Sequence, residues 1–147
     1  MSAGISILNK RARFEYEFLD VLEAGMVLTG TEIKSLRAGN ASITDAYCAF
    51  EEGELFLINA HIAEFKQGNI NNHTPLRKRK LLLKRQELRK LENKLKDKGL
   101  TVVPVKIFES DRGIAKIQIA LAKGKKSFDK REDIKKRDVE REMARFR

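Results

Sequence analysis

Residues that could perform catalysis are few in this chain. Catalysis requires a positioned base, a nucleophile or a metal ion. The sequence contains two histidines, His61 and His73, and one cysteine, Cys48. Two isolated histidines make a poor metal site, a single cysteine has no second sulfur with which to share a metal, and no glycine-rich phosphate loop of standard spacing occurs. We therefore expect no enzymatic activity, no metal and no cofactor.

Basic residues are instead arranged for binding a polyanion. The 31 Lys and Arg exceed the 21 Asp and Glu, and the resulting charge of +10 repels itself unless an anionic partner offsets it. No acidic residue lies between Glu64 and Glu87, so the basic run at 77–85 predicts an exposed loop. Lys34 and Arg37 are three apart on an expected helix, where they are either solvated charges or contacts to nucleic acid.

A membrane is not the expected partner. The sequence contains no stretch of roughly 20 apolar residues and no leader with an apolar centre. Cys48 cannot form a disulfide within the chain, which predicts a packed thiol in a reduced, intracellular protein. We expect the cytoplasm by default.

The elements that would position the basic residues are short strands and helices. Residues 14–21 favour a strand followed by a turn at Gly25. Thr31 is a candidate N-cap for a helix over 32–38, with Glu32 in its first turn. Residues 47–50 and 54–60 flank a Glu-Glu-Gly turn, as in a β-hairpin. Leu88, Leu91 and Leu95 recur at helical spacing and predict a buried stripe.

The C-terminal half of the expected domain consists of two strands. Residues 100–108 alternate loosely, whereas Ala115, Ile117, Ile119 and Leu121 alternate strictly and place Lys116 on the outer face. Several short antiparallel strands predict a small barrel, which is a common scaffold for nucleic-acid binding.

The composition changes at Gly124. Of the last 24 residues, ten are Lys or Arg and six are Asp or Glu, so this segment cannot form a packed core. Val139, Met143 and Phe146 form a thin apolar stripe. We expect a domain over 1–123 and a basic tail over 124–147 that is disordered alone and helical when bound.

Five sequence blocks, in order, resemble the SmpB family of SsrA-binding proteins (small protein B). They are Asn9-Lys10-Arg11-Ala12-Arg13-Phe14-Glu15-Tyr16, the pair Glu23-Ala24-Gly25 and Gly30-Thr31-Glu32-Ile33-Lys34-Ser35-Leu36-Arg37, Asp45-Ala46-Tyr47, Asn72-His73-Thr74-Pro75-Leu76-Arg77-Lys78-Arg79-Lys80-Leu81-Leu82-Leu83, and Gly124-Lys125-Lys126-Ser127-Phe128-Asp129-Lys130-Arg131. The likeness covers nearly the whole chain.

The resemblance implies a six-stranded antiparallel OB-like barrel with about three helices. It implies an adaptor that binds the tRNA-like domain of transfer-messenger RNA (tmRNA, SsrA) and delivers it to stalled ribosomes in trans-translation, with elongation factor Tu in the delivery complex. A monomer is expected.

By matching positions, the resemblance also implies the contact residues. The expected RNA-binding residues are Asn9, Lys10, Arg11, Glu23, Lys34, Arg37, Lys80, Leu81 and Lys116. The carboxylate of Glu23 would repel phosphate, so it would orient a neighbouring cation, accept hydrogen bonds from a base or a 2′-hydroxyl, or form a salt bridge that holds the strand.

The tail would enter the decoding site and the empty messenger channel of the ribosome. The expected tail contacts are Lys125, Lys126, Phe128, Asp129, Lys130, Arg131, Ile134, Lys135 and Arg137. Phe128 stands where some relatives carry histidine, so its contribution would be stacking.

The residues leave two other functions open. A ribosomal or ribosome-assembly protein would share the charge, the barrel and the tail. A nuclease or RNA-modifying enzyme would use Glu23, Asp45 or His73.

Overall fold

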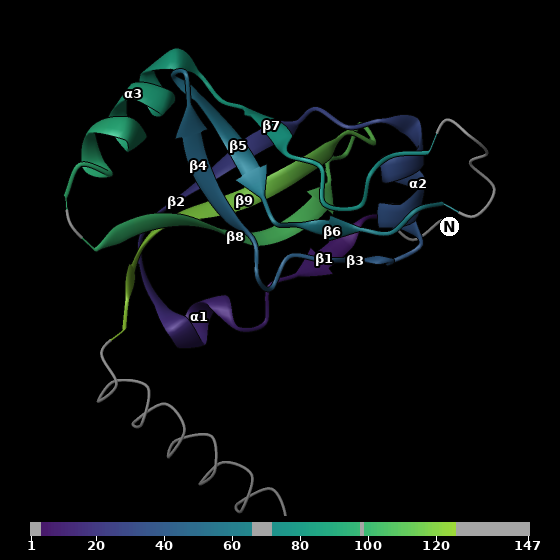
Figure 1. Ribbon diagram of the computed structural model, residues 1–147, viewed down its shortest axis with the longest axis horizontal. Coiled ribbons are helices and arrows are strands. Elements are labelled where there is room, and N and C mark those ends of the chain that lie inside the picture. Colours follow the sequence, from purple (N-terminus) through teal and green to yellow (C-terminus); the bar gives the residue numbers. More distant parts are fainter. Residues whose placement is uncertain (1–3, 66–71, 98, 126–147) are drawn as a thin grey trace, which may run out of the picture.

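Six antiparallel strands close into a ring. The computed structural model describes residues 4–65, 72–97 and 99–125. The strand order in the ring is β8-β4-β5-β7-β2-β9, and β9 pairs again with β8. β1 adds to β8, while β3 pairs with β6. This architecture confirms the six-stranded OB-like barrel with three helices (Figure 1).

The strands are β1 (Ser6–Leu8), β2 (Tyr16–Met26), β3 (Ala41–Ser42), β4 (Tyr47–Glu51), β5 (Glu54–Ile58), β6 (His61–Ile62), β7 (Arg79–Leu82), β8 (Leu100–Glu109) and β9 (Ala115–Gly124). The helices are α1 (Ala12–Glu15), α2 (Gly30–Arg37) and α3 (Arg85–Lys94). α3 and α2 lie at opposite ends of the barrel (Figure 1).

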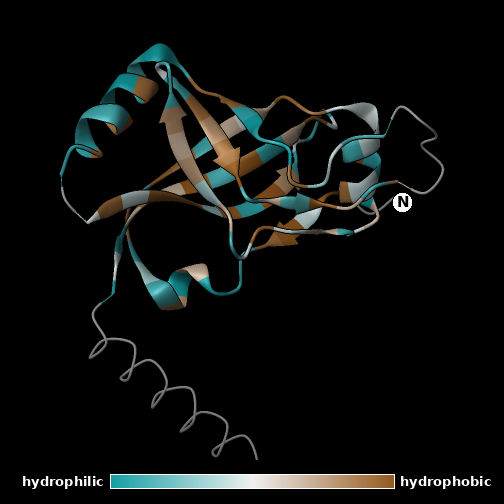
Figure 2. Cartoon of the chain, viewed as in Figure 1, coloured by the Kyte–Doolittle hydropathy of each residue, from teal (hydrophilic) through white to brown (hydrophobic). Residues whose placement is uncertain are grey.

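Apolar side chains from the inner faces of the strands fill the barrel. Figure 2 shows that hydrophobic residues are frequent along the strands, whereas α3 is mainly hydrophilic. Ile117 and Ile119 of β9 are fully buried, as the alternation in this strand predicts. In α3, Leu91 is buried and Leu88 and Leu95 pack against the core, which confirms the predicted leucine stripe. The hairpin is also confirmed, because β4 and β5 join through Glu52 and Gly53, both with positive φ.

β2 differs from its prediction at both ends. Residues 12–15 form α1, so the strand begins at Tyr16. Gly25 does not turn the chain but lies inside β2, where it pairs with Leu82 on one side and Lys116 on the other. A Cβ atom at Gly25 would lie 3.4 Å from the Cβ atom of Leu82, which is ordinary van der Waals contact between the two strands.

α2 begins two residues earlier than the sequence predicted. Its N-cap is Thr29, not Thr31. The Thr29 hydroxyl accepts from the backbone N–H of Glu32, and the Thr29 N–H donates to the Glu32 carboxylate at 2.9 Å. This capping box turns Glu32 into the protein, where it is fully buried.

The partner of buried Glu32 is Arg79, the first residue of β7. Arg79 Nε donates to the Glu32 carboxylate, and Arg77 Nη2 donates to its other oxygen at 2.6 Å. Arg79 also donates to the carbonyls of Ala60 at 2.8 Å and Pro75 at 3.0 Å. Arg79 has no exposed surface, so the prediction that the whole run 77–85 is an exposed loop was wrong.

The ionisation of this pair follows from its surroundings. Burial by itself raises the pKa of Glu32, but hydrogen bonds from Arg77, Thr29 and Arg79 and the charge of Arg79 bring that pKa below its ordinary value. Burial lowers the pKa of Arg79, and Glu32 opposes that shift. Both groups are therefore charged at neutral pH.

A second set of polar contacts joins α2 to β6. His73 is buried between the Thr31 hydroxyl, 2.8 Å from Nδ1, and the Ile62 carbonyl, 2.8 Å from Nε2. The Ser35 hydroxyl donates to the Ala63 carbonyl at 2.6 Å. The histidine therefore joins two elements.

Glu32→Gln should destabilise the protein by about 3–5 kcal/mol, because Arg79 would remain buried without a counter-charge. Glu51→Gln is the matched control. Glu51 pairs with Lys78 at 2.6 Å, and both side chains are about half exposed, so its loss should change the free energy of unfolding by less than about 1 kcal/mol. Urea unfolding of both variants gives the comparison, and equal losses would contradict a dominant role for the buried pair.

The lowered pKa of Glu32 also predicts how stability depends on pH. A carboxylate with a folded-state pKa below its unfolded value stabilises the protein above the unfolded pKa of about 4.3, and this stability is lost as the pH falls through the folded pKa. Wild-type stability should fall in this acidic range more steeply than that of Glu32→Gln. Parallel stability curves between pH 6 and about pH 3 would contradict this assignment.

Candidate RNA interface

The outward side chains of β7, β2, β9, β8 and β1 form one continuous surface, which we call the outer sheet face. One cross-strand row consists of Leu82, Gly25, Lys116, Phe108 and Ser6, and the next consists of Glu23, Gln118, Lys106 and Leu8. Leu8 and Leu82 are 55% and 50% exposed. Apolar and basic side chains are thus interspersed where nucleotides could contact both.

Two β-bulges decide which side chains reach this face. In β2 the register shifts between Phe18 and Asp20, and in β8 it shifts between Pro104 and Lys106. Each bulge adds one residue and reverses the inward and outward alternation beyond it. As a result, Glu23, Lys106 and Phe108 point outward while Ile107 is buried.

The predicted residues Lys116 and Glu23 lie close together on the outer sheet face. Lys116 is half-buried, and within the described ranges it makes no ion pair. Glu23 is exposed and opposite Gln118, and its carboxylate has no hydrogen-bond or ion-pair partner among the residues that the structure describes. The alternative in which Glu23 forms a structural salt bridge therefore finds no support in this part of the chain.

Sequence reasoning did not select Lys106 and Phe108. The Lys106 ammonium lies 5.3 Å from the centre of the Phe108 ring, and Phe108 is directly opposite Lys116. The loose alternation of residues 100–108 was a signal of the bulge, but it did not reveal where the bulge lay.

Leu81 and Lys80 have opposite orientations in β7. Lys80 points outward and forms an ion pair with Glu54, with about two fifths of each side chain exposed. Leu81 is only 2% exposed and belongs to the core. The side chain predicted as an RNA contact at Leu81 is therefore inside the barrel, where it supports β7 without offering a surface to RNA.

Asn9 also has a structural task. Its Nδ2 donates to the Pro104 carbonyl at 2.8 Å and lies 3.4 Å from the Ile43 carbonyl, which ties the end of β1 to β8. The following residues, Lys10 and Arg11, are exposed, and Arg11 lies 3.5 Å from Glu15. Lys10 and Arg11 therefore extend the positive charge beyond β1.

The predicted cations of α2 lie on its exposed surface. Lys34 is 5.5 Å from the ring centre of Phe65, and Arg37 Nε donates to Glu109 at 3.0 Å. Because Glu109 directly follows Phe108, the contact of Arg37 links α2 to the margin of the outer sheet face.

Only the first of the predicted tail residues can be placed. The backbone N–H of Lys125 donates to the Glu15 carbonyl at 3.0 Å. β9 continues through Gly124, one residue beyond the predicted domain limit. The other tail residues, from Lys126 to Arg137, lie outside the described residues.

Other kinds of site receive no support from the described ranges. No group of three or more His, Cys, Asp or Glu in them could hold a metal, and no helix there is long and apolar enough to cross a membrane. Cys48 is buried, and burial raises the pKa of its thiol, which disfavours the reactive thiolate.

Known proteins resemble this chain along nearly its full length. The model of the family described as SmpB protein matches residues 6–147. An SsrA-binding protein of Phocaeicola vulgatus is 57% identical over 97% of this chain and 95% of its own length. One from Flavobacterium psychrophilum is 53% identical over 100% and 98%.

A solved structure shares the fold. It is described as "tmRNA-SmpB: a journey to the center of the bacterial ribosome", and one of its chains matches with a TM-score of 0.71 and 47% identity over 90% of this chain and 94% of that one. The family match, the close relatives and the shared barrel lead to one conclusion: this chain belongs to the SmpB family.

Proposed function

We propose that this protein is a non-enzymatic adaptor that binds the tRNA-like domain of tmRNA and delivers it to stalled ribosomes for trans-translation. The observation that carries the proposal is the outer sheet face, where Lys116 and Lys106 lie beside exposed apolar side chains and make no ion pair within the described ranges. The relatives bear the name SsrA-binding protein, and the structural match belongs to a tmRNA-SmpB complex.

Structured RNA suits this surface. RNA recognition uses phosphate contacts, 2′-hydroxyls and stacking on exposed side chains. Lys116 and Lys106 supply charge, and Phe108 supplies an aromatic ring. The unpaired carboxylate of Glu23 would then accept a hydrogen bond from a 2′-hydroxyl or a base amino group.

The nuclease alternative is weakened by geometry. His73 has both ring nitrogens engaged and is only 6% exposed, so it has no free nitrogen to act as a base on RNA. Glu23 and Asp45 lie on separate elements, β2 and the segment before β4. The described residues therefore favour binding over turnover.

The tail would serve the ribosome and the barrel would serve tmRNA. Phe128 would stack on a base in the decoding site, and the other tail contacts would be Lys125, Lys126, Asp129, Lys130, Arg131, Ile134, Lys135 and Arg137. The protein would act in the cytoplasm as a monomer and would travel in a complex with elongation factor Tu.

Lys116→Glu should weaken binding of the tRNA-like domain about fivefold to tenfold and reduce the slope of log affinity against log salt by about one. Lys80→Glu should weaken binding less, because Glu54 already neutralises part of the Lys80 charge. Lys90→Glu on α3 is the control for net charge. The measurement is a titration of labelled RNA at physiological salt against an elongator tRNA, with circular dichroism as the folding check. Equal losses in Lys116→Glu and Lys90→Glu would show that only net charge matters.

A chain that ends at Lys125 should bind the tRNA-like domain within about twofold of the full chain but fail to rescue stalled ribosomes. This end point keeps all of β9 and the hydrogen bond from Lys125 to Glu15. Tagging of a peptide stalled on a truncated messenger measures rescue in a reconstituted system. A shortened protein that still tags the peptide would refute the division of labour between barrel and tail.

A further inference from the structure

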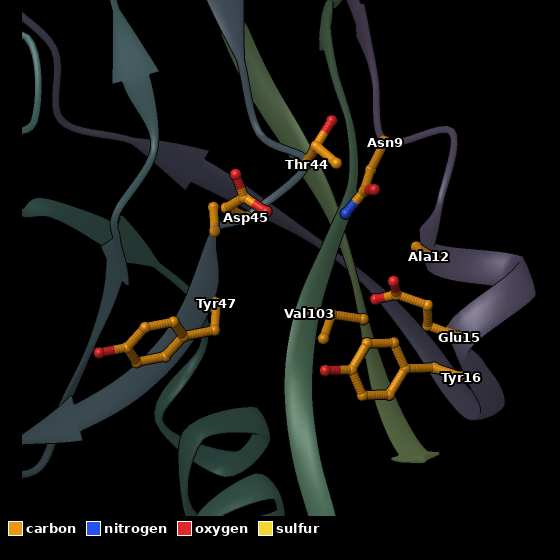
Figure 3. Close-up of a pocket in the computed structure, with 9 residues that line it drawn as sticks. Asn9, Ala12, Glu15, Tyr16, Thr44, Asp45, Tyr47 and Val103 are labelled. Carbon is orange, nitrogen blue, oxygen red and sulfur yellow. The ribbon is translucent and has the colours of Figure 1, made fainter. Parts of the chain in front are cut away.

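A cavity of about 210 Å³ lies between α1, the segment before β4, and β8 (Figure 3). Its lining includes Asn9, Glu15, Tyr16, Asp45 and Val103. The cavity adjoins the outer sheet face, because Asn9 directly follows Leu8 and Val103 precedes the bulge of β8. A strand of RNA on that face would pass close to this opening.

The cavity offers hydrogen-bond acceptors. Asn9 Nδ2 is committed to the Pro104 and Ile43 carbonyls, which leaves Asn9 Oδ1 buried without a partner among the residues that the structure describes. A buried acceptor without a donor is unfavourable, so a small rotation of the Asn9 side chain toward a ligand N–H in the cavity would relieve it. The Asp45 carboxylate has no side-chain partner in the described ranges, and the Glu15 carboxylate has only Arg11 at 3.5 Å. Both residues line the cavity, and Figure 3 shows them on either side of β8, Glu15 on α1 and Asp45 in the segment before β4.

This chemistry restricts the ligand to a neutral, donor-rich group. Phosphate would be repelled by the carboxylates that line the cavity, the exposed Asp45 and the half-buried Glu15. A cationic side chain would be repelled at the rim, where Lys10 and Arg11 are exposed. A nucleobase avoids both penalties, because the base enters the acidic cavity while its own phosphate meets the exposed Lys10.

Among the bases, guanine matches the acceptors best. Its Watson–Crick edge presents N1–H and the N2 amino group side by side, which a carboxylate can accept together. Adenine and cytosine place an acceptor nitrogen beside their amino group, and uracil has one N–H between two carbonyls. Tyr16 supplies an aromatic ring to the lining of the same cavity, next to the largely buried Val103 (Figure 3).

We infer that this cavity binds one unpaired guanosine of an RNA, with Asp45 as the main acceptor of the base. The inference rests on the proposed RNA-binding function. It adds a site that would distinguish guanine from the other bases beside the proposed RNA-binding surface.

The test is a millimolar NMR titration of the ¹⁵N-labelled full chain with GMP, IMP and AMP. GMP should shift the Asn9 side-chain amide, IMP should bind more weakly because it lacks the N2 amino group, and AMP should leave that signal unchanged. Asp45→Asn should weaken GMP binding about fivefold or more, whereas the matched Asp111→Asn in the exposed β8–β9 turn should not. Equal thermal midpoints of the two variants would exclude misfolding.

Three results would overturn the inference. Equal binding of GMP and AMP would indicate phosphate contacts alone. Tighter binding of arginine amide than of GMP would indicate a site for a protein side chain. If none of these probes shifted the NMR signal of the Asn9 side-chain amide, the cavity would not be a nucleotide-binding site.

The source of the guanosine is tested with the same two variants. The affinity of each variant is measured for the tRNA-like domain and for ribosomes. An affinity for one of them that is fivefold lower in Asp45→Asn than in Asp111→Asn would support the inference and identify the RNA that contains the guanosine. Equal affinities of the two variants for both would overturn it. Lys116→Glu tests tmRNA binding by the outer sheet face, and Asp45→Asn tests guanosine binding by the cavity. The failure of one proposal can therefore be distinguished from the failure of the other.

Discussion

The buried ion pair between Glu32 and Arg79 constrains much of the structure. A guanidinium inside a protein needs its counter-charge, so Arg79 must point into the barrel. The alternation of a strand then places Leu81 inside and Lys80 and Leu82 outside. The same pair holds the start of α2 against β7. One buried charge pair thus determines both a helix position and the orientation of the strand that borders the outer sheet face.

The distribution of carboxylates decides which basic residues remain available. Lys78, Lys80 and Arg37 each contact a carboxylate, from Glu51, Glu54 and Glu109 respectively. Lys116 and Lys106 make no such contact within the described ranges. Total charge attracts a polyanion from a distance, but local pairing determines where it is bound. The net charge of +10 therefore indicates an anionic partner but does not show where on the protein that partner is bound.

The two bulges link the barrel to its surface. A regular β2 would point Glu23 inward, and a regular β8 would point Lys106 and Phe108 inward, so the outer sheet face would lose its polar and aromatic groups. Beyond the bulges, towards α1, Val103 of β8 and Ala120 of β9 pack with Tyr16 of β2. The surface thus changes from polar to apolar along the strands, and the cavity lies at the apolar end.

The sequence alone indicated a polyanionic partner, and it determined the hairpin, the leucine stripe of α3 and the orientation of Lys116, because charge, turn residues and apolar periodicity are local properties. It did not reveal that Glu32 and Arg79 are buried together, that Leu81 is inside, or that Lys106 joins the outer sheet face. Glu32 and Arg79 are 47 residues apart, and a surface pattern cannot show that two charges neutralise each other. Strand alternation beyond a bulge depends on the partner strand, so only the tertiary structure could decide which side chains face outward.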